Sequence, residues 1–257
     1  MKSPKILFLD IETSPLVSYT WGLIDQNVGL GQIKEDWFIL SWAAKWAHES
    51  KVMHADQSKT KDISNDKEIL LKLWELLDSA DIVIGQNSTS FDIKKINARL
   101  IIHGIKPYSP FRQADTLRMS RKVAAFTSHK LEYMTDKINK KYKKLKHEKF
   151  SGFEMWKQVL SGNKSAWKEM QKYNMYDVLA TEELYNCLAP WTQSINFNVY
   201  SEDLNNKCAC GSAKLQKRGY NYTNTGKFQR FQCTSCGAWV SSKINILSPE
   251  KKKALRS

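Results

Sequence analysis

The sequence lacks any apolar run close to the roughly 18 residues that a membrane span needs. Its N-terminus also lacks the charged, apolar and small-residue segments of a signal peptide. Cysteine is absent before Cys187, and the other four cysteines lie close together near the C-terminus, in a spacing typical of a metal site rather than of a disulfide framework. We therefore expect a cytoplasmic protein with no membrane partner.

Acidic residues are scarce in the last fifth of the chain. From Asn205 onward, eleven Lys and Arg residues face one acid, Glu250, and the 257-residue chain has a formal net charge of +14. Most of the positive excess therefore lies in this part, as is typical of a segment that binds a polyanion. A solvated, lysine-rich end is the alternative. The length and the 42% hydrophobic content fit one sizeable core and a small module.

Hydrophobic periodicity predicts an α/β core in which three successive strands precede alternating helices and strands. The expected strands cover residues 5–14, 37–46, 51–55, 81–85 and, weakly, 114–117. The expected helices cover residues 66–79, 92–104, 129–137, 153–160 and 164–188. Asn65 or Asp66 is expected to cap the first helix, and Pro190 to end the core.

Two carboxylates lie on one side of the first expected strand. Side chains alternate along a strand, so Asp10 and Glu12 point the same way while their apolar neighbours bury the strand. Two adjacent acids repel each other unless a cation lies between them, and this pattern therefore indicates a divalent-metal site. The alternative is a polar strand end followed by a turn.

Two further segments carry acids that could complete such a site. Asp92 follows a polar turn after a buried strand, where it could also be only a helix N-cap. Tyr173 and Asp177 lie four residues apart on a predicted helix and therefore share a face, although an aromatic residue at that spacing often packs in the core.

Taken together, these segments resemble a known family. Asp10-x-Glu12, Asn87-x-x-x-Phe91-Asp92 and Tyr173-x-x-x-Asp177 are similar, in order and spacing, to the motifs of the DEDD superfamily of 3′–5′ exonucleases in its tyrosine form (DEDDy). That superfamily includes the proofreading domains of DNA polymerases. The resemblance covers about residues 5–190, and it implies a ribonuclease H-like fold, in which a mixed sheet is flanked by helices.

The resemblance also implies roles for single residues. The ligands of two Mg²⁺ or Mn²⁺ ions would be Asp10, Glu12, Asp92 and Asp177. Hard oxygen ligands favour these metals over zinc, and two ions about 4 Å apart stabilise the charges of phosphodiester hydrolysis. Tyr173 would position the attacking water.

Other residues would handle the substrate. Thr13, Asn87 and Phe91 would lie near the terminal nucleotide, with packing as the alternative for Phe91. The family more often has His where this chain has Gln86, and His129 is not needed in the tyrosine form, so we interpret it as a surface or helix-start residue. Seven lysines in residues 137–149 either contact the entering strand or form a solvated surface.

The C-terminal cysteines are spaced as the two knuckles of a zinc ribbon that binds one Zn²⁺. The ligands would be Cys208, Cys210, Cys233 and Cys236. The first knuckle is Cys-x-Cys where Cys-x-x-Cys is usual, which could strain its geometry. Between the knuckles we expect a hairpin that turns at residues 224–226, in a module too small to fold without zinc.

Basic and aromatic residues alternate on this module, which resembles ribbons at the ends of transposases and other nucleic-acid enzymes. Basic groups attract phosphates and aromatic rings stack on bases. The expected contacts are Lys217, Arg218, Tyr220, Tyr222, Lys227, Phe228 and Arg230. The alternative is a structural ribbon whose aromatic residues form its own small core.

The predicted organisation is an exonuclease domain (residues 1–190), a linker (191–206), a zinc ribbon (207–247) and a basic tail (248–257). The predicted activity is metal-dependent 3′–5′ exonucleolysis, preferably of single-stranded DNA or frayed ends, with DNA favoured over RNA. Two alternatives stay open: a structure-selective endonuclease on the same fold, and a non-catalytic nucleic-acid-binding protein. No polymerase core fits in the remaining length, so proofreading would need a separate replication or repair protein.

Overall fold

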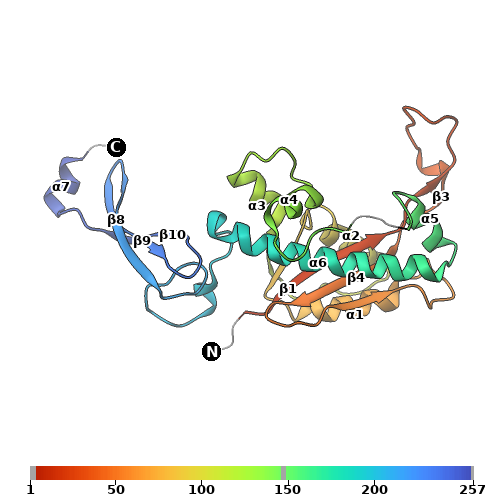
Figure 1. Ribbon diagram of the computed structural model, residues 1–257, viewed down its shortest axis with the longest axis horizontal. Helices are drawn as coiled ribbons and strands as arrows, with labels where there is room; N and C mark the ends of the chain where they lie inside the picture. The colour runs from red at the N-terminus through yellow and green to blue at the C-terminus, as the bar shows by residue number, and fades with distance from the viewer. Residues whose placement is uncertain (1–3, 146–148, 256–257) are drawn as a thin grey trace. The chain divides into compact units, whose positions relative to one another are not determined.

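The computed structural model describes residues 4–145 and 149–255 of the chain (Figure 1). The described chain packs as two compact units, Lys5–Tyr185 and a second unit that begins at Asn186. The long helix α6 (Lys164–Thr192) runs through this boundary. Within the described residues, no helix is long and apolar enough to cross a membrane.

The first unit is built on a five-stranded mixed sheet with the order β5-β4-β1-β6-β7. Its strands are β1 (Ile6–Thr13), β4 (Ile39–Trp46), β5 (Met53–Asp56), β6 (Ile82–Gly85) and β7 (Arg112–Asp115). The strands β1, β4 and β5 form an antiparallel meander, and β6 and β7 run parallel to β1. The central position of β1 explains its apolar sequence, because both of its edges are paired and both of its faces are covered.

The two faces of β1 have different partners. Leu7, Leu9 and Ile11 are buried in the core with α1 (Lys67–Asp78) and α2 (Asp92–Ile102). The alternate side chains face the other way, where the ring of Phe8 lies 5.8 Å from that of Tyr185 on α6. Figure 1 shows α6 running along the sheet. Asp10 and Glu12, on the same side as Phe8, therefore face α6.

Smaller elements complete the first unit. Between β1 and β4 the chain forms a hairpin of β2 (Val17–Ser18) and β3 (Ile33–Glu35), with the 3₁₀ helix η1 (Leu30–Gln32) before β3. The three short helices are α3 (Thr116–Val123), α4 (Leu131–Ile138) and α5 (Glu154–Leu160). A second apolar cluster joins α5 and the start of α6 to β4.

The second unit is a three-stranded antiparallel sheet with the order β10-β9-β8. Its elements are η2 (Phe197–Tyr200), β8 (Leu215–Thr223), β9 (Gly226–Cys233), β10 (Trp239–Asn245) and α7 (Pro249–Ala254). The expected hairpin turns between β8 and β9, where the sequence predicts it. A Cβ on Gly226 would collide with the Phe228 ring, so a larger residue there requires that ring to move.

The predicted α/β class is confirmed, and two local expectations are corrected. Asp66 occupies the expected N-cap position of α1, but its side chain makes no capping bond, because that carboxylate accepts hydrogen bonds from Arg99 and from the Ile39 amide. The last helix, expected to end at about Leu188, continues through Pro190 to Thr192, since a proline in the last turn removes only one backbone donor.

Part of the predicted linker is structured. The amide of Phe197, in η2, donates to the carbonyl of Ala209 at 2.8 Å. The side-chain amide of Asn198 donates to the carbonyl of Cys208, also at 2.8 Å. This segment is therefore anchored on the first cysteine knuckle. The predicted domain boundaries themselves stay a prediction.

Candidate active site

Three carboxylates from β1 and α6 meet on the α6 side of the sheet. Oxygen atoms of Asp10, Glu12 and Asp177 all lie within 4.8 Å of one another. The two acids on β1 share a face because of the strand alternation. Asp177 reaches them from α6, where Tyr173, one turn earlier, points to the same side.

Asp92 lies next to this group but is not one of the three. It is the first residue of α2, and its Oδ1 accepts a hydrogen bond of 3.0 Å from the amide of Ile11, the residue between the two acids of β1. The structure thus brings all four predicted carboxylates to the same stretch of β1, with three in one tight cluster.

Burial and mutual repulsion change the acidity of these groups. Burial, with repulsion by Asp177, raises the pKa of Glu12 to about 8. Burial likewise raises the pKa of Asp92 to about 7. The pKa of Asp10 is raised well above its usual range by burial and by the neighbouring carboxylates. A nearby cation favours the ionised form of these carboxylates, and a hard metal ion coordinated by their oxygens would supply one.

Lys144 contributes one positive charge to the cluster. Its Nζ lies 2.6 Å from Oδ2 of Asp177 and 4.5 Å from the centre of the Tyr173 ring. Burial lowers the pKa of Lys144, but Asp177 and Tyr173 together outweigh burial and raise this pKa above its ordinary value. Lys144 belongs to the lysine-rich segment 137–149, and nothing in the sequence distinguishes it from its neighbours.

The phenol of Tyr173 keeps its proton at neutral pH. Burial raises the pKa of Tyr173, and the Lys144 ammonium opposes this only in part. Tyr173 also borders an open hollow of about 240 Å³. The other lining residues are Leu145, Lys149, Ser165, Lys168, Glu169 and Lys172.

Asn174 is a site residue that the sequence reasoning missed. Its side-chain Nδ2 donates to Oδ2 of Asp10 at 2.6 Å and to the Asp10 carbonyl at 3.1 Å. Its Oδ1 accepts a bond of 3.2 Å from the hydroxyl of Ser41 on β4. Asn174 is fully buried. Asn is unfavourable in the interior of a helix. Its presence within the predicted helix 164–188 was the sequence signal that could have identified Asn174 as a site residue.

The predicted substrate residues lie near the predicted metal ligands in the sequence. Thr13 ends β1, and its carbonyl accepts a bond from the Trp156 indole. Asn87 has a positive φ of 59°, and its amide donates to Asp115 at 2.9 Å. Phe91 directly precedes Asp92 and is partly exposed, at 38%.

His129 is half-buried and lies two residues before the start of α4, as its expected place at a helix start implies. Its Nδ1 lies 2.9 Å from the Ser120 hydroxyl, and its carbonyl accepts a bond from the side chain of Gln86. His129 therefore fixes the segment before α4 against the turn that carries Asn87.

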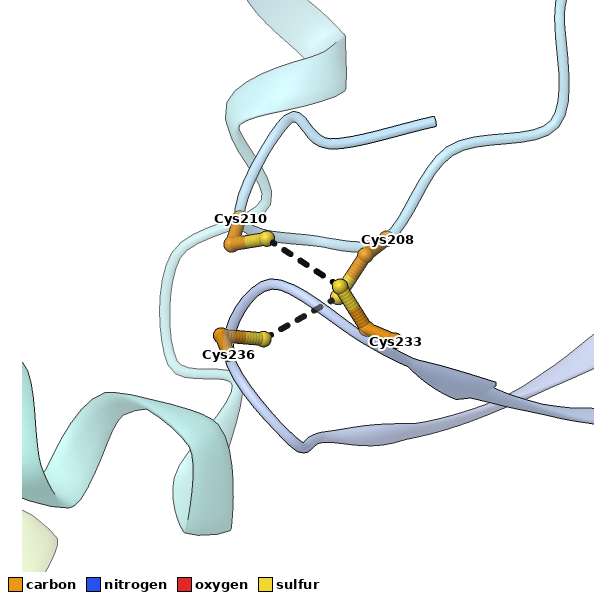
Figure 2. A group of neighbouring side chains, drawn as sticks. All are labelled: Cys208, Cys210, Cys233 and Cys236. Atoms are coloured by element: carbon orange, nitrogen blue, oxygen red, sulfur yellow. Dashed lines mark hydrogen bonds between the residues drawn. The ribbon is translucent and has the colours of Figure 1, made fainter. Parts of the chain in front are cut away.

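The four C-terminal cysteines form a second cluster, shown in Figure 2. The Sγ atoms of Cys208 and Cys236 lie 3.6 Å apart, and those of Cys210 and Cys233 lie 3.8 Å apart. Four thiolates about 2.3 Å from one zinc ion have S···S distances of about 3.8 Å, whereas a disulfide needs about 2.05 Å. The donor set and its spacing fit zinc.

Backbone donors favour the thiolate form in one of these knuckles. Burial opposes ionisation of Cys233, but the amides of Cys236 and Ser235 lower its pKa to about 7. Gly211 and Gly237, which follow the two knuckles, have φ values of +87° and +80°, a region that favours glycine.

The predicted basic and aromatic contacts lie on the strands β8 and β9. Exposed residues among them are Lys217, Arg218, Tyr220, Tyr222 and Arg230, while Lys227 and Phe228 are half-buried. The Lys227 ammonium lies 4.0 Å from the centre of the Tyr220 ring. Arg230 lies 4.8 Å from the ring of Trp239 on β10, an exposed aromatic residue that the sequence reasoning missed.

Comparisons with known proteins agree with this architecture. A family model described as RNase_H superfamily matches residues 7–189. Over 143 residues the chain is 27% identical to the DNA polymerase III PolC-type of Ureaplasma parvum serovar 3 (strain ATCC 700970). This match covers 53% of the present chain and 10% of the polymerase. The chain thus spans a small part of this relative.

A solved structure has a similar fold. The family B DNA polymerase from the hyperthermophilic archaeon Pyrobaculum calidifontis superposes with a TM-score of 0.53 at 14% identity, over 76% of this chain and 26% of that chain. The expected ribonuclease H-like sheet with flanking helices is thereby confirmed.

Proposed function

Because the chain belongs to the RNase H superfamily, we propose that it is a metal-dependent 3′–5′ exonuclease of the DEDD tyrosine type. The observation that carries this proposal is the cluster of Asp10, Glu12 and Asp177, with Asp92 bonded to the strand between its members. Single-stranded DNA, or a frayed duplex end, is the proposed substrate.

The carboxylates suit two Mg²⁺ or Mn²⁺ ions. Asp10, Glu12 and Asp177 would hold one ion, and Asp10 and Asp92 the other. Bound in this way, the two ions would stabilise the negative charge that develops on the attacking and leaving oxygens. The raised pKa values of Glu12 and Asp92 support this assignment, because they reflect carboxylates whose charge needs a cation.

The remaining polar groups would orient the reactants. Tyr173, with its phenol protonated, would donate or accept one hydrogen bond to the attacking water. Asn174 fixes the carboxylate of Asp10 by its bond to Oδ2. Thr13, Asn87 and Phe91 would contact the terminal nucleotide of the strand.

The C-terminal unit would hold the same nucleic acid. We propose one Zn²⁺ on Cys208, Cys210, Cys233 and Cys236, and backbone or base contacts from the residues of β8 and β9. The contacts would come from Lys217, Arg218, Tyr220, Tyr222, Lys227, Phe228 and Arg230. Thiols kept for metal binding fit a reducing compartment, which supports the cytoplasm as the location.

DNA is the preferred polymer in this proposal because both relatives are named as DNA polymerases. Each of them is a much longer chain than the part that this chain matches. We propose a separate replication or repair protein as a partner.

A degradation assay tests the activity. Single-stranded DNA labelled at the 5′ end should shorten one nucleotide at a time from the 3′ end, with release of mononucleotides, and only with Mg²⁺ or Mn²⁺. RNA of the same sequence should shorten more slowly. Asp10→Ala should lower the rate at least about a thousandfold, while Glu68→Ala, which removes an exposed carboxylate of α1, should leave it unchanged. Internal fragments from a circular single strand, or full activity of Asp10→Ala, would overturn the proposal.

A further inference from the structure

Two basic side chains lie beside the turn that carries Phe91 and Asp92. Lys95 is one turn after Phe91 on α2, and its Nζ lies 5.7 Å from the centre of the Phe91 ring. The guanidinium of Arg118, on α3, donates a bond of 3.3 Å to the hydroxyl of Ser90, the residue before Phe91. Both cations are therefore close to a partly exposed ring that directly precedes a predicted metal ligand.

The Lys95 side chain is held in place by a second ring. Its Nζ lies 3.4 Å from the centre of the Trp37 ring. Trp37 directly precedes Phe38, whose backbone is bonded to Ser14 at the end of β1. Burial lowers the pKa of Lys95 more than the carboxylate of Asp36 raises it. An ammonium group that is partly removed from water in this way is stabilised by an anion brought beside it.

Neither cation forms an ion pair in the described part of the chain. The ion pairs there involve other basic residues. The Arg118 guanidinium instead bonds a neutral hydroxyl, and the Lys95 ammonium lies beside neutral rings. The four predicted carboxylates of the site repel a polyanion, and cations beside them offset this repulsion. A phosphate is therefore the ligand that suits these two positions.

We propose that Lys95 and Arg118 each bind a phosphate of the substrate strand, next to the nucleotide that contacts Phe91. The two contacts hold the strand where it crosses the turn before α2, so that the scissile phosphate stays at the carboxylates. Phosphate contacts fix the position of a strand without reading its bases, and the pair therefore acts on any sequence. This inference rests on the proposed exonuclease function and extends it to the way in which the strand is held.

Steady-state kinetics test these contacts. Lys95→Gln/Arg118→Gln should raise KM for single-stranded DNA about tenfold or more, because two charge-assisted bonds are lost, while kcat stays within about twofold. The slope of log K against log salt should fall by about 0.7 for each contact, hence by up to about 1.4. The matched control Lys94→Gln/Arg121→Gln removes the same charge from exposed positions of the same two helices and should keep the wild-type values. A loss of kcat without a rise in KM, or an equal effect of the control, would overturn the proposal.

Uncharged phosphates give a second readout. One phosphate at a time near the 3′ end is replaced by a methylphosphonate, and the Kd of the strand is measured with Ca²⁺ in place of Mg²⁺. With the wild-type protein the Kd should rise at two positions. Lys95→Gln should be insensitive to the replacement at one of them and Arg118→Gln at the other, because each contact has then already lost its charge.

The same methylphosphonate profile for all three proteins would overturn the proposal. A wild-type protein that binds the strand but does not shorten it would contradict the exonuclease function alone, because the binding profile needs no cleavage.

Discussion

Asn174 connects three parts of the first unit through one buried amide. It bonds Asp10 on β1 and Ser41 on β4 from its place on α6. Because Nδ2 donates to Oδ2 of Asp10, that oxygen has a fixed direction before any cation arrives. Partners that orient metal ligands in this way are commonly worth 10- to 100-fold in metal affinity.

Asn174→Ala should therefore raise the Mg²⁺ concentration needed for half-maximal cleavage about 10- to 100-fold. It should also lower the free energy of unfolding by about 1–3 kcal/mol, since Asp10 and Ser41 lose a buried partner. Cleavage measured across a Mg²⁺ titration, together with urea unfolding, separates the two effects.

Gln57→Ala is the matched control for this variant. Gln57 is a buried amide that bonds the Asn65 carbonyl and the Thr60 hydroxyl, away from the carboxylates. It should lose similar stability with an unchanged Mg²⁺ requirement. If Asn174→Ala loses stability with the same Mg²⁺ requirement as the wild type, its role is only in packing.

Local periodicity was enough to predict which carboxylates share a face. Asp10 and Glu12 follow from the strand alternation, and Tyr173 and Asp177 follow from the helix repeat. Contacts between distant segments were out of reach, as the pairing of Lys144 with Asp177 shows. Asp66 illustrates the same limit: its position suggested a cap, but Arg99, 33 residues later, binds its carboxylate.

Most helices and strands with a buried apolar face were predictable, and β5, which has no fully buried residue, was predicted from its alternation. The strands β1, β4 and β6 have the apolar sequences of central strands, and α1 has a regular apolar stripe. The helix α3 was missed because its sequence, largely polar, buries only Thr116, Met119 and Ser120. The strand β10 was missed because no residue of it is buried.

The sheet of the ribbon has little core of its own. Its buried apolar group consists of Cys208, Cys233 and Ala238, with Leu215, Cys236 and Val240 packed against them. Most of β8 is exposed. A unit with so few buried side chains needs another source of stability, and the cysteine cluster can supply it by binding zinc.

Cys210→Ser should therefore remove zinc from the protein and unfold the ribbon, while the first unit keeps its own unfolding transition. The metal content should fall from one zinc per chain to none, as measured by atomic emission, and the lower-temperature calorimetric transition should disappear. Cys187→Ser changes the fifth cysteine, which lies on α6 outside the cluster, and should retain zinc. Full zinc content in Cys210→Ser would show that this thiol is not a ligand.

Taken as a whole, the chain carries its positive charge unevenly. From Asn205 onward there is a single acid, and the structure places Lys217, Arg218 and Arg230 on exposed strands of one small sheet. The first unit instead gathers its carboxylates at one site. A chain of this kind would hold a polyanion mainly through its second unit and act on it with the first.

Replacing Lys217, Arg218, Lys227 and Arg230 by Ala should make binding of single-stranded DNA less dependent on salt. Each lost phosphate contact lowers the slope of log K against log salt by about 0.7 for single strands, so the four changes should lower it by up to about three. Binding is measured by fluorescence anisotropy with Ca²⁺ from about 50 to 300 mM salt.

A control variant removes four exposed charges from the first unit: Lys51, Lys59, Lys61 and Lys67. Because long-range attraction is screened within about 10 Å, the control should keep nearly the wild-type slope of log K against log salt. Equal changes of this slope in both variants would mean that net charge alone, and not the ribbon, holds the strand.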